Sequence, residues 1–123
     1  LIYQIKSEFL LKNLIQIDLN AKDNNDQSLI IKCNEITGTG RSDIFRIKDP
    51  NFEWYYKGKW YELSNSENRV GKDWIVKFSK KIVTLYNKKT EWNRRIDMEK
   101  MIASMQFPTG EEYLYSCSNI SDI

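Results

Sequence analysis

The chain has 123 residues, of which 41% are hydrophobic and 29% are charged, and its formal net charge is +2 at pH 7. This length suits one domain with its own core, and no run of about 18 apolar residues is present to form a transmembrane helix. Histidine is absent and only two cysteines occur. The sequence therefore excludes a Ser–His or Cys–His nucleophile and argues against a zinc site.

Residues 1–28 differ in pattern from the rest of the chain. Leu10, Leu14 and Ile17 have helical spacing, but the alternation of apolar and polar residues around Ile17 fits a strand equally well. Residues 21–28 are polar and turn-prone, as in a linker. We therefore predict an N-terminal extension and linker over residues 1–28, with a helical or extended segment within it.

From residue 29 onward, short stretches of alternating apolar and polar side chains are separated by turn signals. The predicted strands cover residues 29–35, 42–48, 52–56, 60–63, 74–79, 82–87, 92–96, 98–107 and 112–117. The stretch 98–107 also has helical spacing, and its neighbours favour a strand. About eight short strands at this spacing predict an all-β fold, either a small antiparallel barrel or a sandwich.

Cys33 and Cys117 lie in the first and last of these predicted strands. Such strands are often neighbours in barrels and sandwiches, so we predict a disulfide that closes a β domain over residues 29–123. A disulfide indicates an oxidising compartment, and we therefore expect a secreted or periplasmic protein. In a reducing cytosol the same cysteines would be two small buried thiols.

Acidic residues offer little support for catalysis. Asp97 and Glu99 would share one face of a strand, and Glu111 and Glu112 lie in the last predicted turn, as surface acids commonly do. The acidic stretch 23–26 lacks the glycine and the distal glutamate of a calcium loop. We predict a protein that is not an enzyme and that has no cofactor and no bound metal.

Aromatic residues cluster around one predicted hairpin, whose loop is expected to span residues 57–59 around Gly58. The cluster consists of Trp54, Tyr55, Tyr56, Trp60 and Tyr61. Alternation places Tyr55 and Tyr61 opposite the other three, so one covered face cannot bury them all. Exposed aromatic side chains are typical anchors of protein interfaces, although a sheet covered on both faces would bury them as core. We predict binding to a protein partner or self-association, as a subunit or accessory protein of a larger complex.

A basic stretch supports an alternative function, which is binding of single-stranded nucleic acid by a small barrel. Proteins of this class combine a basic groove with stacking aromatic side chains. The candidate residues are Lys80, Lys81, Lys88, Lys89, Trp92, Arg94 and Arg95. The pI of about 8.5 is lower than such domains usually have.

The C-terminal third carries a resemblance. The run Asn93-Arg94-Arg95-Ile96-Asp97, the turn Pro108-Thr109-Gly110 and a last strand ending in Cys117 resemble those of small secreted, disulfide-closed β-domains of bacteria and phages whose function is uncharacterised. Met98-Glu99 departs from that pattern. The chain is also similar to periplasmic β-barrel lysozyme inhibitors, although their active-loop motif is not recognisable. Both resemblances imply an exported, non-enzymatic β domain. Inhibitor function is not carried over from the second resemblance, and a periplasmic enzyme inhibitor is kept only as a further alternative function.

Overall fold

The computed structural model describes residues 28–121, and the predicted N-terminal extension and linker over residues 1–28, with its helical or extended segment, lies outside them except for Ser28. The described chain forms an all-β fold, as predicted, with nine antiparallel strands in one sheet. The strands are β2 (Leu29–Glu35), β3 (Ser42–Lys48), β4 (Asn51–Tyr56), β5 (Lys59–Glu62), β6 (Trp74–Ser79), β7 (Ile82–Asn87), β8 (Asn93–Asp97), β9 (Ile102–Gln106) and β10 (Glu112–Asn119). Within residues 28–121, helix is limited to the single 3₁₀ turn Gly71–Asp73, and no helix there is long and apolar enough to cross a membrane.

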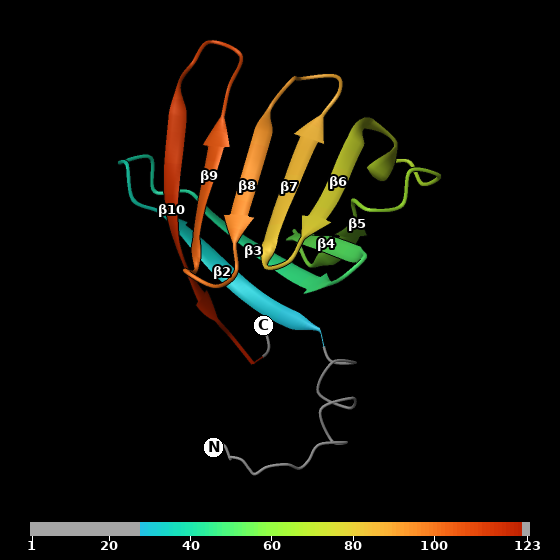
Figure 1. The fold of residues 1–123 in the computed structure, drawn as a ribbon, viewed down its shortest axis with the longest axis horizontal. Helices are drawn as coiled ribbons and strands as arrows, with labels where there is room; N and C mark the ends of the chain where they lie inside the picture. Colours follow the sequence, from blue (N-terminus) through green and yellow to red (C-terminus); the bar gives the residue numbers. More distant parts are fainter. Residues whose placement is uncertain (1–27, 122–123) are drawn as a thin grey trace.

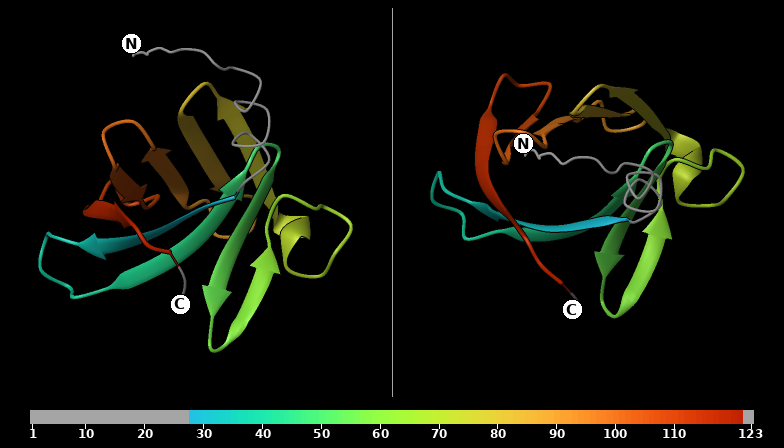
Figure 2. Two further views of the ribbon diagram at one scale, coloured as in Figure 1. Left: turned by 90° about the horizontal axis from the view of Figure 1, so that it is seen from below. Right: turned by 60° about the horizontal axis from the view of Figure 1, so that its bottom comes forward.

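The sheet consists of two meanders that meet at the first and last described strands. The strand order is β5-β4-β3-β2-β10-β9-β8-β7-β6, so β2–β5 form one meander and β6–β10 form the other. The sheet curls into a half-barrel in which the two meanders face each other (Figures 1 and 2). We call its concave side the cup. Residues 63–73 connect the two outer strands, β5 and β6, which do not pair with each other in the described sheet.

The core fills the cup, because alternate side chains of each strand point to the concave face. In β2, for example, Ile31, Cys33 and Glu35 are buried, while Lys32 and Asn34 are exposed. The buried hydrophobic side chains are Ile31, Cys33, Phe45, Ile47, Phe52, Leu63, Val83, Leu85, Ile96, Ala103, Met105, Tyr115 and Cys117. Members of this set come from both meanders, so the packing that forms the core also holds the two meanders against each other.

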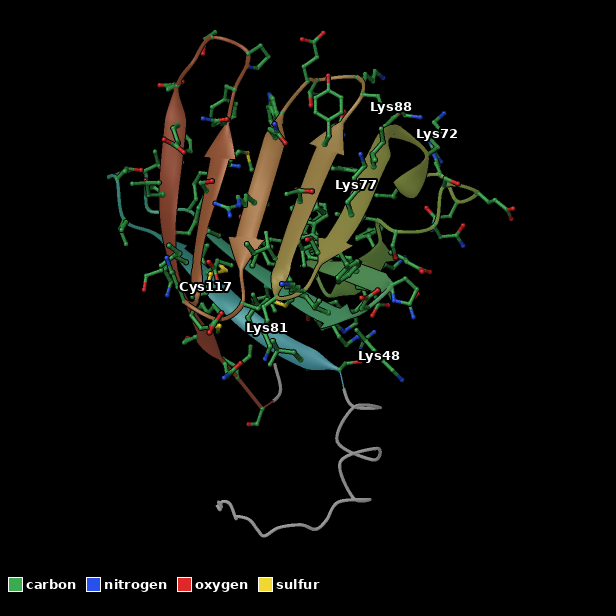
Figure 3. The ribbon with its side chains drawn as sticks, viewed as in Figure 1. Lys48, Lys72, Lys77, Lys81, Lys88 and Cys117 are labelled. Carbon is green, nitrogen blue, oxygen red and sulfur yellow. A yellow bond between two sulfur atoms is a disulfide. The ribbon has the colours of Figure 1, made fainter. Side chains whose placement is uncertain are left out.

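The predicted disulfide between Cys33 and Cys117 is present. The two residues are direct cross-strand partners in the ladder between β2 and β10. This ladder is the seam between the two meanders, so the disulfide joins them at the middle of the strand order (Figure 3 labels Cys117).

Two local predictions were wrong. The predicted strand over residues 98–107 begins only at Ile102, because the Asp97 carboxylate accepts the backbone N–H groups of Glu99 and Lys100, at 3.0 and 2.9 Å, and folds the chain into a turn. The loop between β4 and β5 has two residues rather than three. Lys57 and Gly58 adopt φ values of 49° and 82°, the left-handed pair typical of a type I′ turn.

Candidate functional site

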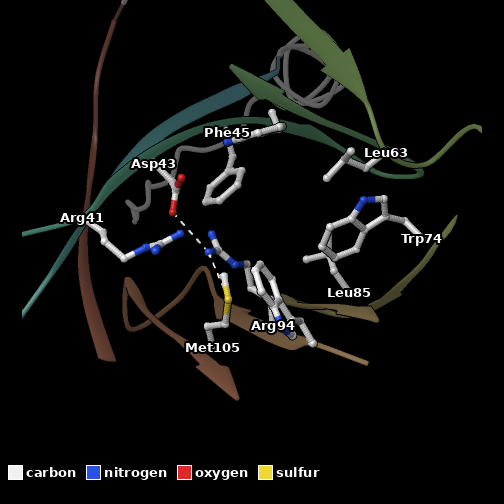
Figure 4. Close-up of a pocket in the computed structure, with 10 residues that line it drawn as sticks. Arg41, Asp43, Phe45, Leu63, Trp74, Leu85, Arg94 and Met105 are labelled. Atoms are coloured by element: carbon white, nitrogen blue, oxygen red, sulfur yellow. Dashed lines mark hydrogen bonds and ion pairs between the residues drawn. The ribbon is translucent and has the colours of Figure 1, made fainter. Parts of the chain in front are cut away.

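The cup contains a pocket with a volume of about 170 Å³, which we call the cup pocket. Its wall is mainly aromatic and aliphatic, and it is built by strands from both meanders (Figure 4). The lining residues are Arg41, Asp43, Phe45, Trp54, Leu63, Trp74, Leu85, Trp92, Arg94 and Met105. Asp43 and Arg94 occupy inward-facing strand positions that sequence alternation would normally give to apolar residues, whereas Arg41 lies just before β3 and is exposed.

An ion pair crosses the cup. Nη2 of Arg94 on β8 lies 3.1 Å from Oδ2 of Asp43 on β3, and the side chains are only 8% and 16% exposed. Strands β2, β10 and β9 separate these two strands in the sheet order, so the pair spans the concavity rather than linking sheet neighbours. The Arg94 guanidinium also lies 5.1 Å from the centre of the Phe45 ring and 5.2 Å from that of Tyr115. Buried charge is thus compensated by both a carboxylate and two ring faces.

Arg41 also lines this polar end of the cup pocket, and Tyr115 lies behind it, with its ring against Arg94. The Arg41 side chain points toward Asp43 and Arg94 (Figure 4) and forms no ion pair with another residue of the described range 28–121. Tyr115 is 1% exposed, and its hydroxyl makes no hydrogen bond of good geometry there. Burial raises the pKa of the Tyr115 phenol, although the Arg94 guanidinium acts in the opposite direction. One carboxylate, that of Asp43, is therefore paired with Arg94 alone, and the second guanidinium at this end, that of Arg41, adds a further positive charge.

The aromatic hairpin of β4 and β5 presents side chains on both of its faces. Trp54 faces the cup, where it stacks on Tyr56 with ring centres 4.7 Å apart and lies 6.1 Å from the Tyr61 ring. Tyr55 and Trp60 meet edge to face at 5.1 Å on the outer face. The prediction therefore assigned Trp60 and Tyr61 to the wrong faces, because the two-residue turn pairs Tyr55 with Trp60 and Trp54 with Tyr61.

The tip of this hairpin carries aromatic and basic groups. We define the hairpin surface as Tyr55, Tyr56, Lys57, Lys59 and Trp60. Tyr56 is 44% exposed, and the Lys57 ammonium lies 5.3 Å from the centre of its ring. The hairpin extends away from strands β6–β10 (Figure 2), which leaves the tip accessible.

A neighbouring ion pair supports the outer face of the hairpin. Arg46 of β3 holds Glu53 through two hydrogen bonds of 2.5 and 3.1 Å, and its guanidinium lies 4.2 Å from the Trp60 ring centre. The hydrogen bond and charge of Glu53 raise the pKa of Arg46. This contact fixes Trp60 in place, so the hairpin surface is preorganised.

The structure does not bring the nucleic-acid candidates into one groove. Lys80 and Lys81 form the turn before β7, while Lys88 and Lys89 follow β7 at its other end (Figure 3 labels Lys81 and Lys88). Arg94 is buried in the cup, whereas Arg95 is exposed on the outer face. Trp92 lines the cup pocket and packs edge to face on Phe107, with ring centres 5.2 Å apart.

Sequence reasoning missed an apolar surface on the outside of the sheet. We call it the outer patch, and it consists of Ile36, Ile102 and Leu114, which are 64%, 50% and 42% exposed. The backbone N–H of Ile36 donates to the carbonyl of Leu114 at 2.8 Å, which draws the patch together. The signal was present in the sequence, because Ile102 and Leu114 stand out of phase with the inward residues Ala103 and Tyr115.

Sequence reasoning also missed the polar end of the cup pocket. On β3, Asp43 points to the same face as the buried residues Phe45 and Ile47. On β8, Arg94 points to the same face as Ile96, so both charged residues occupy inward positions. Opposite charges at inward positions of two strands were the available signal for a buried pair.

Among the acidic candidates, Asp97 holds the turn after β8. The turn N–H groups, first that of Lys100, lower the pKa of Asp97, whereas a general acid needs a raised pKa. Among residues 28–121, no three His, Cys, Asp or Glu side chains gather in a way that could hold a metal ion.

The cup pocket and the hairpin surface are therefore the two candidate binding sites of the described residues. Comparisons with protein-family models, curated proteins and solved structures find no match to this chain. The resemblance of the C-terminal third to secreted β-domains and the similarity of the chain to lysozyme inhibitors stay predictions.

Proposed function

We propose that this protein is a non-catalytic binding domain that recognises an acidic surface of a protein partner through its hairpin surface. The observation that carries the proposal is the projecting hairpin tip, where the 44% exposed ring of Tyr56 lies beside Lys57. Its natural setting is as a subunit or accessory protein of a larger complex.

The chemistry of the hairpin surface suits a protein interface. Tyrosine and tryptophan bury a large rigid area on binding and are enriched among the residues that dominate interface energies. Lys57 and Lys59 flank the turn, and the segment 54–61 contains no acidic residue. A partner with acidic side chains would gain attraction at long range and hydrogen bonds at contact.

Several observations support a binding role over catalysis. The chain has no histidine, and its cysteines are joined in a disulfide. The Asp97 carboxylate is committed to a turn, and the inward Asp43 is paired with Arg94. The exposed aromatic and basic side chains of the hairpin surface suit binding of a partner.

The disulfide also supports an oxidising, exported setting, either secreted or periplasmic, for the proposed partner. Alkylation of the protein taken directly from its native source, followed by mass spectrometry, tests this part of the proposal. Cysteines protected from alkylation support it, and fully alkylated cysteines contradict it.

A capture experiment tests the proposed interface. The immobilised full-length protein is exposed to the oxidising fraction of its source, and Tyr56→Ser/Lys57→Glu is compared with the outer-patch control Leu114→Ser. Tyr56 and Leu114 have nearly equal exposure, 44% and 42%, so both changes remove similar accessible apolar groups. We expect the wild type and Leu114→Ser to retain the same protein and the hairpin variant to lose it. The purified partner should then repeat this order, with affinity at least about tenfold weaker for the hairpin variant.

Each alternative gives a different result. Equal retention by the hairpin variant, or loss with Leu114→Ser alone, contradicts the hairpin surface as the interface. A dimer seen by sedimentation velocity and abolished by the hairpin change would identify the partner as a second copy. Strongly salt-dependent binding to single-stranded DNA would favour the nucleic-acid alternative. Inhibition of a captured enzyme would favour the inhibitor alternative.

A further inference from the structure

The cup pocket has the size and wall of a site for a small apolar group. Its volume is about 170 Å³, and most of the wall consists of the side chains of Phe45, Trp54, Leu63, Trp74, Leu85, Trp92 and Met105. An apolar cavity of about 150 Å³ is large enough to take up a benzene molecule. The cup pocket therefore fits one ring or a short branched chain, and it is small for a larger cofactor.

The polar end of the cup pocket has an excess of positive charge. Arg94 is neutralised by Asp43 at 3.1 Å, whereas Arg41 has no ion pair with any other residue in the range 28–121. Two guanidinium groups and one carboxylate leave a net charge of +1 at this end. Arginine presents several N–H donors in a planar arrangement that matches a carboxylate.

Tyr115 lies behind this polar end. Its side chain is buried, and the Arg94 guanidinium lies over its ring, 5.2 Å from the ring centre. Tyr115 does not line the cup pocket. Arg41 is therefore the donor that a ligand in the pocket can reach.

We propose that the cup pocket binds a small monocarboxylate whose apolar part is one ring or a short branched chain. The apolar group lies against the tryptophan side chains, and the carboxylate accepts hydrogen bonds from the Arg41 guanidinium. A singly charged anion matches the net charge of +1, whereas a phosphate or sulfate would bring two negative charges next to Asp43. Trp54 of the pocket wall stacks on Tyr56 of the hairpin surface, but occupancy of the pocket does not require a protein partner.

Titration with phenylacetate tests the proposal, and phenylacetamide serves as the uncharged control of the same shape. Three tryptophans line the cup pocket, so their fluorescence reports entry of the ring, and calorimetry gives the affinity. A ligand of about ten non-hydrogen atoms should bind with a Kd on the order of 0.1–1 mM. We expect phenylacetamide to bind at least about tenfold more weakly, because it lacks the charge that complements Arg41.

Variants with a matched control locate the carboxylate. Arg41→Gln should weaken phenylacetate binding about tenfold and leave the affinity for phenylacetamide unchanged. Arg95→Gln removes the same charge from the outer face and should change neither affinity.

Three results would overturn the proposal. The first is absence of binding by phenylacetate up to about 10 mM, a concentration well above the expected Kd. The second is equal affinity for phenylacetate and phenylacetamide. The third is equal weakening by Arg41→Gln and Arg95→Gln, which would show general attraction by the positive protein in place of a specific contact.

Discussion

Arg94 and Asp43 bring opposite charges into a cup that is otherwise lined by aromatic and aliphatic side chains. Removing charges from water is costly, and a buried pair is stable mainly because each charge compensates the other. The pair also joins β8 to β3 across the concavity. Its loss should therefore affect the packing of the two meanders against each other.

Arg94→Met is expected to lower the free energy of unfolding by about 2–4 kcal/mol, because it leaves Asp43 inside the cup without its cation. The 16% exposure of Asp43 allows some hydration, which places the expected loss at the lower part of the usual range. The double variant Arg94→Met/Asp43→Asn should recover part of this loss. Urea denaturation measures all three proteins, and a double variant less stable than Arg94→Met would contradict this account.

Glu35 carries the clearest pH dependence of a single residue. Burial opposes ionisation of its carboxylate, but hydrogen bonds from the Thr39 hydroxyl and from the N–H groups of Thr39, Thr37 and Gly40 outweigh burial and lower its pKa. A pKa lower in the folded than in the unfolded chain means that this stabilisation is complete above the unfolded pKa. It is lost as the pH falls through the folded pKa.

The loop between β2 and β3 should therefore loosen in acid. We expect amide exchange at Thr37, Thr39 and Gly40 to increase below about pH 4, relative to the intrinsic rate, as the Glu35 carboxylate is protonated. Glu35→Gln should show the faster exchange already at pH 7 and little further change in acid. Protection that is independent of pH in the wild type would refute this role of Glu35.

The loop over residues 63–73 is the element that connects the two outer strands of the half-barrel. Asn68 organises it, since its side chain donates to the Glu62 carbonyl at 3.1 Å and accepts the N–H of Gly71 at 2.6 Å. Gly71 is buried, and a Cβ atom there would lie only 2.2 Å from the carbonyl oxygen of Asn65. The position thus requires glycine because another backbone segment approaches it closely.

Gly71→Ala should destabilise the protein by about 1–3 kcal/mol, because the clash is with backbone that has to move. The exposed Ser66→Ala in the same loop serves as the control and should have almost no effect. Thermal unfolding followed by circular dichroism compares the two variants. An unchanged Tm for Gly71→Ala would show that the loop shifts without cost.

The strands were predictable from alternation. The face on which each aromatic side chain lies and the partner of each buried charge depend on how the strands pair in three dimensions. Residues 74–79 and 82–87, for example, are recognisable as strands because apolar and polar side chains alternate regularly along them. Trp60 and Tyr61 were assigned to the wrong faces because a two-residue turn pairs the strands differently from a three-residue turn. Arg94 was treated as a surface cation, because its partner Asp43 is 51 residues away and belongs to a strand that is not its neighbour.

At the scale of the whole molecule, the disulfide joins the two meanders at their seam. Cys33 and Cys117 are 84 residues apart, so the bond closes almost the whole described chain into one loop. Closing a loop of this length should stabilise the fold by about 4–5 kcal/mol in the chain-entropy model.

Cys33→Ala/Cys117→Ala is expected to lose about this amount, mainly because its unfolded chain gains freedom. Urea denaturation of the double variant and of the wild type gives the difference in the free energy of unfolding. The single variant Ser118→Ala, at an exposed position of the same strand, is the control and should keep the wild-type stability. A loss below about 1 kcal/mol would mean that residual structure already restricts the unfolded chain without the disulfide.

The central claim is that the hairpin surface binds an acidic protein partner, and site-specific photo-crosslinking tests it most directly. A photoreactive phenylalanine analogue replaces either Tyr56 at the hairpin tip or Leu114 in the outer patch, and each protein is irradiated in the oxidising fraction of its source. The account predicts one covalent adduct with an acidic protein at position 56 and none at position 114. An adduct that forms at position 114 and not at position 56 would contradict it.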